Sequence, residues 1–174
     1  MIVSARPLDV LREKFGDKVK ENVLLAPYTS ARIGGPADIF LAADTASELA
    51  RIASELWKHG LPFTMLGGGS NVLVSDRGIR GVVVLNRAKG VKFHLGDQPS
   101  VTVESGVVFS NLANRCASKG LAGLEWAATV PGTIGGAVYG NAGAFGGDVA
   151  GDLLSAELLT ENGSETFTSE QMGY

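Results

Sequence analysis

Ten of the 24 glycines in the chain fall in two short segments. The first is residues 66–71, with the sequence LGGGSN, and the second is residues 131–147. A glycine inside a helix or strand costs roughly 0.5–1 kcal/mol relative to alanine, so such clusters indicate that something approaches the backbone closely. We therefore expect both segments to lie at a binding site, and a phosphate-bearing cofactor is the ligand that they favour.

The composition is that of an ordinary globular protein of one domain or two small ones, with 174 residues, 45% hydrophobic and 19% charged. The net charge of -3 argues against a nucleic-acid partner. Arg6 and Asp9 interrupt the apolar start too early for a signal peptide, and no later apolar run is long enough to cross a membrane. These features predict a cytoplasmic protein, which we expect to be a monomer.

Few side chains suit metal binding or nucleophilic catalysis. Cys116 is the one cysteine, and it lies in a predicted helix, where a core position is more frequent than a reactive thiol. His59 and His94 lie outside the glycine segments and form no ligand set, so we expect no metal. Residues 121–174 hold seven acids and neither lysine nor arginine, which indicates a solvated face or basic partners on polypeptide outside this chain.

Hydrophobic periodicity and turn residues predict an α+β fold. Thr45 and Glu48 have the spacing of a capping box, which starts a helix that closes at Gly60. The other predicted helices are residues 8–15 and 108–119. The predicted strands are residues 37–42, 62–66, 72–75, 81–85, 91–95 and 100–104, with a terminal hairpin from 153 to 167.

The first glycine segment is predicted to connect two strands, because the strand-like residues 72–74 follow it. This context differs from the dinucleotide fingerprint, which precedes a helix, and from the nucleoside-triphosphatase loop, which contains a lysine. Consecutive backbone N–H groups in such a turn can bind an anion, and Ser70 and Asn71 add side-chain donors. A plain turn between strands is the alternative.

The second glycine segment predicts a helix start, with Thr129 or Val130 as the cap and Pro131 at the first helical position. Free N–H groups would then point outward from residues 132–134, where the helix dipole favours an anion. Tight helix packing is the alternative reason for Gly135, Gly136 and Gly140.

Two such donor loops suggest one long diphosphate cofactor, flavin adenine dinucleotide (FAD), lying between two lobes. Residues 140–147 are mostly glycine and alanine, and so poor a set of side chains would let a flat flavin ring approach the backbone. Neither glycine segment contains His or Cys, so we expect non-covalent binding.

Several motifs together resemble one family, the bacterial UDP-N-acetylenolpyruvoylglucosamine reductases of peptidoglycan synthesis. The matching residues are 29–38 (TSARIGGPAD), 66–73 (LGGGSNVL), 123–125 (GLE), 130–136 (VPGTIGG) and 141–144 (NAGA). Each motif alone is weak, but their order and spacing are specific, and the resemblance covers nearly all of the chain from about residue 22 onward.

The resemblance implies a two-lobed FAD-binding region of the vanillyl-alcohol-oxidase (PCMH) type. It also implies an enzyme in which NADPH reduces the flavin, and the flavin then reduces UDP-N-acetylglucosamine enolpyruvate to UDP-N-acetylmuramate. By the family pattern, the first loop meets the pyrophosphate, and the second segment lines the flavin and its ribityl chain. The cofactor-binding residues expected on this basis are Gly67, Gly68, Gly69, Ser70, Asn71, Thr129, Val130, Pro131, Gly132, Thr133, Gly135, Gly136, Asn141, Gly143 and Ala144.

Members of that family continue into a substrate-binding domain that carries the proton-donating serine and a glutamate. The chain is therefore expected to be a fragment with no catalytic residue of its own, and Tyr174 is expected to contact substrate. We expect an N-terminal lead (1–21), a first FAD-binding lobe (22–86) and an incomplete second lobe (87–174). The alternatives are another flavin oxidase or dehydrogenase of the same fold, a non-catalytic flavin-binding module, and a small structural domain.

Overall fold

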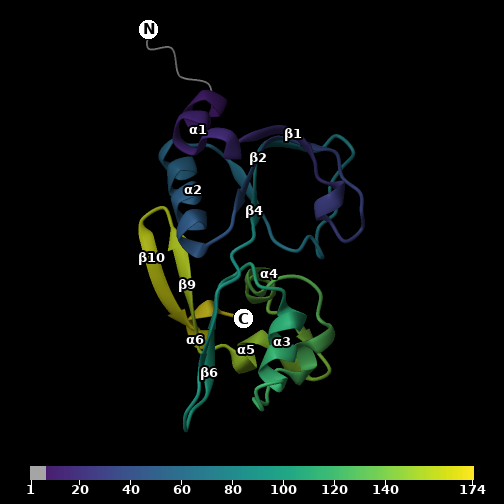
Figure 1. Ribbon diagram of the computed structural model, residues 1–174, viewed down its shortest axis with the longest axis vertical. Helices are drawn as coiled ribbons and strands as arrows, with labels where there is room; N and C mark the ends of the chain where they lie inside the picture. The colour runs from purple at the N-terminus through teal and green to yellow at the C-terminus, as the bar shows by residue number, and fades with distance from the viewer. Residues whose placement is uncertain (1–6) are drawn as a thin grey trace. The chain divides into compact units, whose positions relative to one another are not determined.

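The computed structural model describes residues 7–174, which form two compact units, up to Arg87 and from Ala88 onward (Figure 1). The first unit is built on a four-stranded sheet in the order β1-β2-β4-β3. Strand β1 (Lys20–Leu24) is antiparallel to β2 (Pro36–Ala43), whereas β2, β4 (Ile79–Asn86) and β3 (Phe63–Leu66) are mutually parallel. The carboxyl ends of these three parallel strands therefore lie at one edge of the sheet.

The parallel strands bury both of their faces, because successive side chains alternate between two hydrophobic clusters. Leu41 and Val84 point toward the helices α1 (Pro7–Phe15) and α2 (Ala46–Lys58), while Phe40 and Val83 point toward the other face. In Figure 1, α2 lies along β2. The other face is covered by the coil that carries Leu25 and Val74, so irregular backbone takes the place of helices there.

Helix α2 begins as predicted, with one change in its cap. The Thr45 side chain accepts a hydrogen bond from the backbone N–H of Glu48 at 3.1 Å. The Glu48 carboxylate, however, accepts from the N–H of Asp44 at 2.9 Å, one residue before the box position. Hydrogen bonds from Lys18 and from that N–H lower the pKa of Glu48, so the carboxylate also ties η1 (Gly16–Lys18) to the helix.

The predicted strand at residues 72–75 is wrong, because these residues are coil. Val74 is buried against Gly34, but its neighbour Leu73 is 80% exposed, and no strand within residues 7–174 pairs with the segment. The connection from β3 to β4 is therefore one irregular segment, residues 67–78. A run of three consecutive apolar residues, two of them β-favouring valines, misled the prediction, since a strand also needs a neighbour for its N–H and C=O groups.

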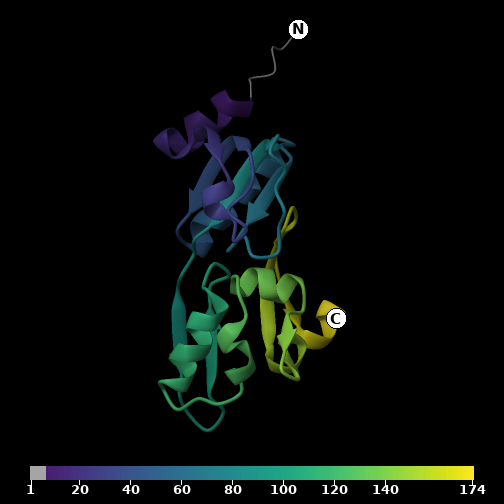
Figure 2. The same cartoon turned by 90° about the vertical axis from the view of Figure 1, so that its right-hand side faces the viewer.

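The second unit has short strand pairs packed with short helices (Figure 2). Strands β5 (Val91–His94) and β6 (Ser100–Val103) form where strands were predicted and pair with each other, and helix α3 (Phe109–Ala117) packs on them through Leu112 and Cys116. Beyond α3 come η3 (Glu125–Thr129), α4 (Ile134–Tyr139), β7 (Gly143–Ala144), β8 (Gly147–Asp148) and α5 (Val149–Asp152).

The predicted terminal hairpin is confirmed, with β9 (Ser155–Thr160) paired to β10 (Gly163–Thr168) over six residues. A short helix not predicted from the sequence follows, α6 (Ser169–Met172), which has a capping box between Thr168 and Gln171. Within residues 7–174, no helix is both long and apolar enough to span a bilayer.

Candidate functional site

The first glycine loop leaves β3 at the edge of the sheet where the parallel strands end. Gly68, Ser70 and Asn71 are exposed, and Gly67 is half-buried. None of the backbone N–H groups of residues 68–71 donates to a residue between 7 and 174, and neither do the side chains of Ser70 and Asn71. The loop therefore presents a row of unused donors, the arrangement that binds anions.

Gly69 differs from the other residues of this loop because the neighbouring backbone fixes its conformation and position. It is buried, has φ +65°, and accepts a hydrogen bond on its carbonyl from the N–H of Ser30 at 2.9 Å. A Cβ at this position would lie 2.1 Å from the carbonyl oxygen of Tyr28. The close approach inferred from the sequence is thus made, at this residue, by the chain's own backbone.

The segment that presses on Gly69 is residues 28–36, which runs alongside the whole 67–78 connection. Gly35 donates its N–H to the carbonyl of Ser75 at 2.8 Å, and a Cβ on Gly35 would lie 2.0 Å from the carbonyl oxygen of Asp76. A Cβ on Gly78 would lie 1.8 Å from the carbonyl oxygen of Pro36. Two motifs that are forty residues apart therefore form one rigid support for the donor row, and sequence reasoning did not foresee this pairing.

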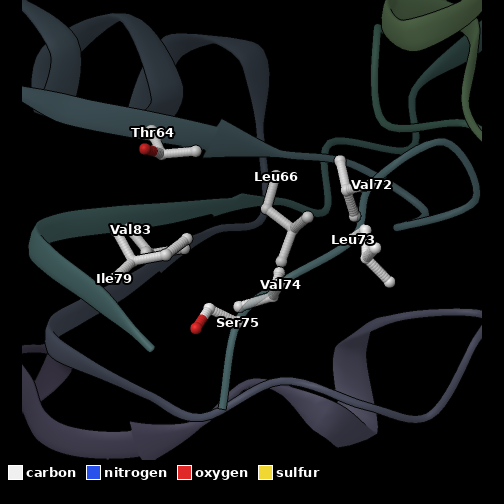
Figure 3. Close-up of a pocket in the computed structure, with 8 residues that line it drawn as sticks. All are labelled: Thr64, Leu66, Val72, Leu73, Val74, Ser75, Ile79 and Val83. Carbon is white, nitrogen blue, oxygen red and sulfur yellow. The ribbon is translucent and has the colours of Figure 1, made fainter. Parts of the chain in front are cut away.

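A cavity of about 250 Å³ lies beside this connection. Figure 3 shows aliphatic side chains from β3, β4 and the 72–75 coil around it, with only two hydroxyl groups. Its lining residues are Thr64, Leu66, Val72, Leu73, Val74, Ser75, Ile79 and Val83. The cavity carries no charged side chain, so its lining is mainly apolar.

The predicted helix start at the second glycine segment is wrong. Thr129 ends η3, and α4 begins only at Ile134, with Thr133 as its N-cap. Pro131 lies between the two in non-helical backbone, and Val130 is the half-buried residue before it. Gly132 has φ +101°, a conformation that is not helical and that delays the helix by three residues.

Of the three N–H groups expected to point outward, at residues 132–134, only that of Ile134 donates to another described residue. Ile134 donates to the carbonyl of Val107 at 2.9 Å, and Gly135 donates to the carbonyl of Ser105 at 2.7 Å. Among the described residues, the N–H groups of Gly132, Thr133 and Gly136 lack an acceptor. The helix has six residues, so it also offers little dipole.

The glycines in α4 and at its end differ in how closely other atoms approach them. A Cβ on Gly135 would lie 2.9 Å from the Cβ of Ser105, so the alternative of tight packing applies at this position. A Cβ on Gly136 would meet nothing closer than 3.8 Å, and one on Gly140 nothing closer than 3.6 Å. Gly136 is exposed, so among these three it is the candidate for close approach by a ligand.

The residues after α4 form a tight β-hairpin from β7 to β8. Asn141, at φ +41°, accepts a hydrogen bond on its side-chain oxygen from the N–H of Ala150 at 2.9 Å, so this oxygen has a structural role. Gly143 is exposed and Ala144 is half-buried in the hairpin. Phe145 at the hairpin tip is 86% exposed, which corrects the expectation that this segment presents only small side chains.

A second exposed aromatic side chain, Tyr139, ends α4 and is 93% exposed. Sequence reasoning passed over Tyr139 and Phe145, although an aromatic residue beside a glycine in a turn was the available signal. Exposed apolar side chains mark a binding surface when they form a contiguous patch.

An aromatic pair fixes the base of this region. The rings of Phe109 and Trp126 meet edge to face with centroids 5.3 Å apart, and the indole N–H of Trp126 donates to the Asp152 carboxylate at 2.6 Å. A Cβ on Gly147 would lie 2.4 Å from the Trp126 ring. These contacts hold η3, α3, β8 and α5 together around the hairpin.

The remaining candidates have structural surroundings. Tyr174 donates its hydroxyl to the carbonyl of Val138 at 2.6 Å, and burial raises its pKa. Cys116 is buried in the α3 core and burial raises its pKa, which confirms the core prediction. His59 lies 3.6 Å from Glu55, and His94 contacts the Thr102 hydroxyl at 2.9 Å. Residues 7–174 contain no group of three His, Cys, Asp or Glu side chains that could hold a metal.

Known proteins share much of this sequence. Residues 37–169 match a family described as the FAD binding domain. The UDP-N-acetylenolpyruvoylglucosamine reductase of Bacillus velezensis is 44% identical over 165 residues, covering 94% of this chain and 54% of the relative. That of Rubrobacter xylanophilus is 43% identical over 151 residues, covering 86% and 50%. The chain spans about half the length of these curated relatives.

Solved structures agree with the sequence comparison. The UDP-N-acetylenolpyruvylglucosamine reductase of Thermus caldophilus is similar with a TM-score of 0.72 and 31% identity, over 88% of this chain and 54% of that one. An alkyldihydroxyacetonephosphate synthase is similar with a TM-score of 0.70 at 19% identity, over 94% of this chain and 35% of that one. The second likeness concerns the fold alone.

Proposed function

The chain belongs to the family of FAD binding domains, and from this premise we propose that it is the FAD-binding part of a UDP-N-acetylenolpyruvoylglucosamine reductase. The α+β fold of the vanillyl-alcohol-oxidase type predicted from the sequence is confirmed by the family match and the solved neighbours. The proposed whole enzyme uses NADPH to reduce UDP-N-acetylglucosamine enolpyruvate to UDP-N-acetylmuramate, in the cytoplasm, as a step of cell-wall synthesis. Relatives named for this reductase are 43–44% identical to the chain, which supports the proposal.

The observation that carries the proposal is the row of unused backbone N–H groups at residues 68–71. A diphosphate needs several donors at once, and a preformed loop supplies them without a large ordering cost. The supporting backbone of residues 28–36 keeps the loop in place before any ligand binds. We assign Gly67, Gly68, Ser70 and Asn71 to the diphosphate, with Gly69 as the residue that shapes the loop.

In the second unit we assign seven residues of the glycine segment, most of them exposed or half-buried, to the flavin and its ribityl chain. These residues are Thr129, Pro131, Gly132, Thr133, Gly136, Gly143 and Ala144, with Val130, Gly135 and Asn141 holding the backbone in position. Bound FAD would supply the acceptance and donation of hydride. The chain's own residues bind and orient it, and we propose that the chain alone does not turn over NADPH in response to substrate.

The test is a titration of the 174-residue chain with FAD, followed by flavin fluorescence and by the amide spectrum of the labelled chain. We expect saturable binding, with the amide signals of residues 68–71 among those that move most. Because Ile134 and Gly135 already donate to carbonyls, their amide signals should exchange slowly with solvent before and after binding. Absence of saturable binding would contradict the proposal, and substrate-dependent NADPH oxidation would contradict the assignment of a binding part only.

Another FAD-dependent oxidase or dehydrogenase of the same fold is the second candidate function, since the likeness to an alkyldihydroxyacetonephosphate synthase extends over 94% of the chain. The identity to that protein is 19%, against 44% for the reductase of Bacillus velezensis. The proposed reductase is a monomeric enzyme that acts on a UDP-sugar substrate. We therefore keep the reductase as the proposal, and a full-length protein active on another substrate would replace it.

A further inference from the structure

Arg32 lies on the segment that supports the first glycine loop. The N–H of Ser30 donates to the Gly69 carbonyl, and further along Gly34 packs against Val74, where a Cβ on Gly34 would lie 2.8 Å from the Val74 Cβ. The two segments run in the same direction, so Arg32 falls between these two contacts. By interpolation between the two contacts, the part of the connection that corresponds to Arg32 is residues 70–73, which include the exposed Ser70 and Asn71.

The backbone at Arg32 is unfavourable for an arginine. Its φ is +57°, and the left-handed region costs a non-glycine residue roughly 1–2 kcal/mol. The conformation is imposed by a turn in which Arg32 donates its N–H to the Thr29 carbonyl at 3.2 Å and the buried Thr29 hydroxyl donates to the Ile33 carbonyl at 2.8 Å. Folding alone would favour glycine here, so the side chain needs a separate reason.

The Arg32 guanidinium has no ion-pair partner among the described residues, so its charge can interact with a ligand. One N–H group donates to the Pro27 carbonyl at 3.3 Å, and within residues 7–174 no carboxylate lies within ion-pair distance of Arg32. Residues 61–75 contain neither an acid nor a base. Arg32 is therefore an exposed cation on the segment that supports a loop with free N–H groups and no charge of its own.

We propose that Arg32 binds the diphosphate of the cofactor at the 67–71 loop, an inference that rests on the proposed FAD-binding function. A guanidinium offers several N–H donors in a planar fork that matches phosphate oxygens, and its charge does not depend on pH in the physiological range. The diphosphate would then be held by backbone N–H groups on one side and by one formal charge on the other. This arrangement differs from binding by main-chain dipoles alone.

The test uses Arg32→Gly in the 174-residue chain, because glycine suits the left-handed backbone and the variant should fold at least as well as the parent. Dissociation constants are measured for FAD and for riboflavin, which has no phosphate. We expect FAD affinity to fall about tenfold to a hundredfold, as for loss of a hydrogen bond to a charged group, with riboflavin affinity unchanged. FAD binding by the parent should also weaken more with added salt than binding by the variant.

Two control variants separate the effect of the Arg32 charge on FAD affinity from other effects of the substitution. Asn22→Gly relieves the other left-handed residue in the first 30 residues described, at φ +53° on β1, without removing a charge. Lys58→Gln removes one exposed positive charge on α2, which covers the opposite face of the sheet. Both variants should bind FAD as the parent does. Equal losses in Lys58→Gln and Arg32→Gly would overturn the proposal in favour of a general charge effect.

The outcomes distinguish this inference from the proposed function. If the parent binds FAD and Arg32→Gly binds it equally well, Arg32 is not a ligand and the proposed function stands. If riboflavin affinity falls together with FAD affinity, the arginine acts on the fold of the site and the inference is again wrong. If the parent binds neither ligand, both the proposed function and the inference fail.

Discussion

The two glycine-rich segments look alike in sequence, but the chain uses their backbone N–H groups to different extents. In the first loop the N–H groups of residues 68–71 are unused, while the glycine carbonyl at 69 and the backbone behind it anchor the loop. In the second segment Ile134 and Gly135 donate inward, to the carbonyls of Val107 and Ser105. A cluster of glycines therefore indicates close approach, but it does not tell whether a ligand or the chain itself approaches.

The largest expected effect comes from Gly69→Ala. The added Cβ would lie 2.1 Å from the Tyr28 carbonyl oxygen, and alanine at φ +65° is strained, so we expect a loss of about 2–4 kcal/mol in the free energy of unfolding. The matched control is Gly96→Ala, where a Cβ meets nothing within 4 Å. Chemical denaturation measures both. A Gly69 variant as stable as the Gly96 variant would show that the 28–36 support is not rigid.

A smaller effect is expected from Gly135→Ala in the second segment. The Cβ would meet the side chain and carbonyl of Ser105 at 2.9 and 3.1 Å, and we expect a loss of about 1–2 kcal/mol after the gain from alanine in a helix. Gly136→Ala on the next position of α4 has open space and should be neutral or stabilising. If both variants behave alike, packing does not explain the difference between the two glycines.

The contrast between the segments also explains what the sequence could and could not predict. Local signals were sufficient for α2, where Thr45 caps the helix, and for the β9–β10 hairpin, where the turn Glu161-Asn162-Gly163 defines the register. They failed for residues 72–75 and for the start of α4, because those backbones are decided by distant partners. Residues 72–75 pack against Gly34. The start of α4 is fixed by hydrogen bonds to the carbonyls of Ser105 and Val107.

The candidate site follows the same rule. The motif residues 67–71 were found because their composition is unusual, and their exposure could be inferred from glycine, serine and asparagine together. The support by residues 28–36 could not be inferred, since nothing local to either segment encodes the contact between Ser30 and Gly69. The exposure of Phe145 was not predicted, because the glycines around it indicated a segment of small side chains.

Asn141 tests whether the second segment is held by side chains as well as by backbone. Asn141→Ala removes the hydrogen bond to the Ala150 N–H and adds strain at φ +41°, so we expect a loss of about 1–3 kcal/mol. Asn141→Gly removes the same bond but relieves the strain, so it should lose less. The difference between the two variants in thermal or chemical unfolding isolates the backbone contribution. Equal losses would show that the left-handed conformation is not maintained in solution.

The smallest effect is expected at the far end of α4, where Tyr174 donates its hydroxyl to the Val138 carbonyl. Tyr174→Phe should cost about 0.5–1 kcal/mol at neutral pH, because the side chain is 43% exposed and water can replace the bond. Burial raises the pKa of Tyr174, so the protonated form is favoured by folding. Its contribution is therefore complete below the ordinary tyrosine pKa of about 10 and is lost as pH rises through the folded value. The stability difference between parent and variant, measured by denaturation from pH 7 to pH 11, should shrink over that range. A constant difference would mean that the hydroxyl does not donate to the end of α4, and that the second segment is held by its internal amide bonds alone.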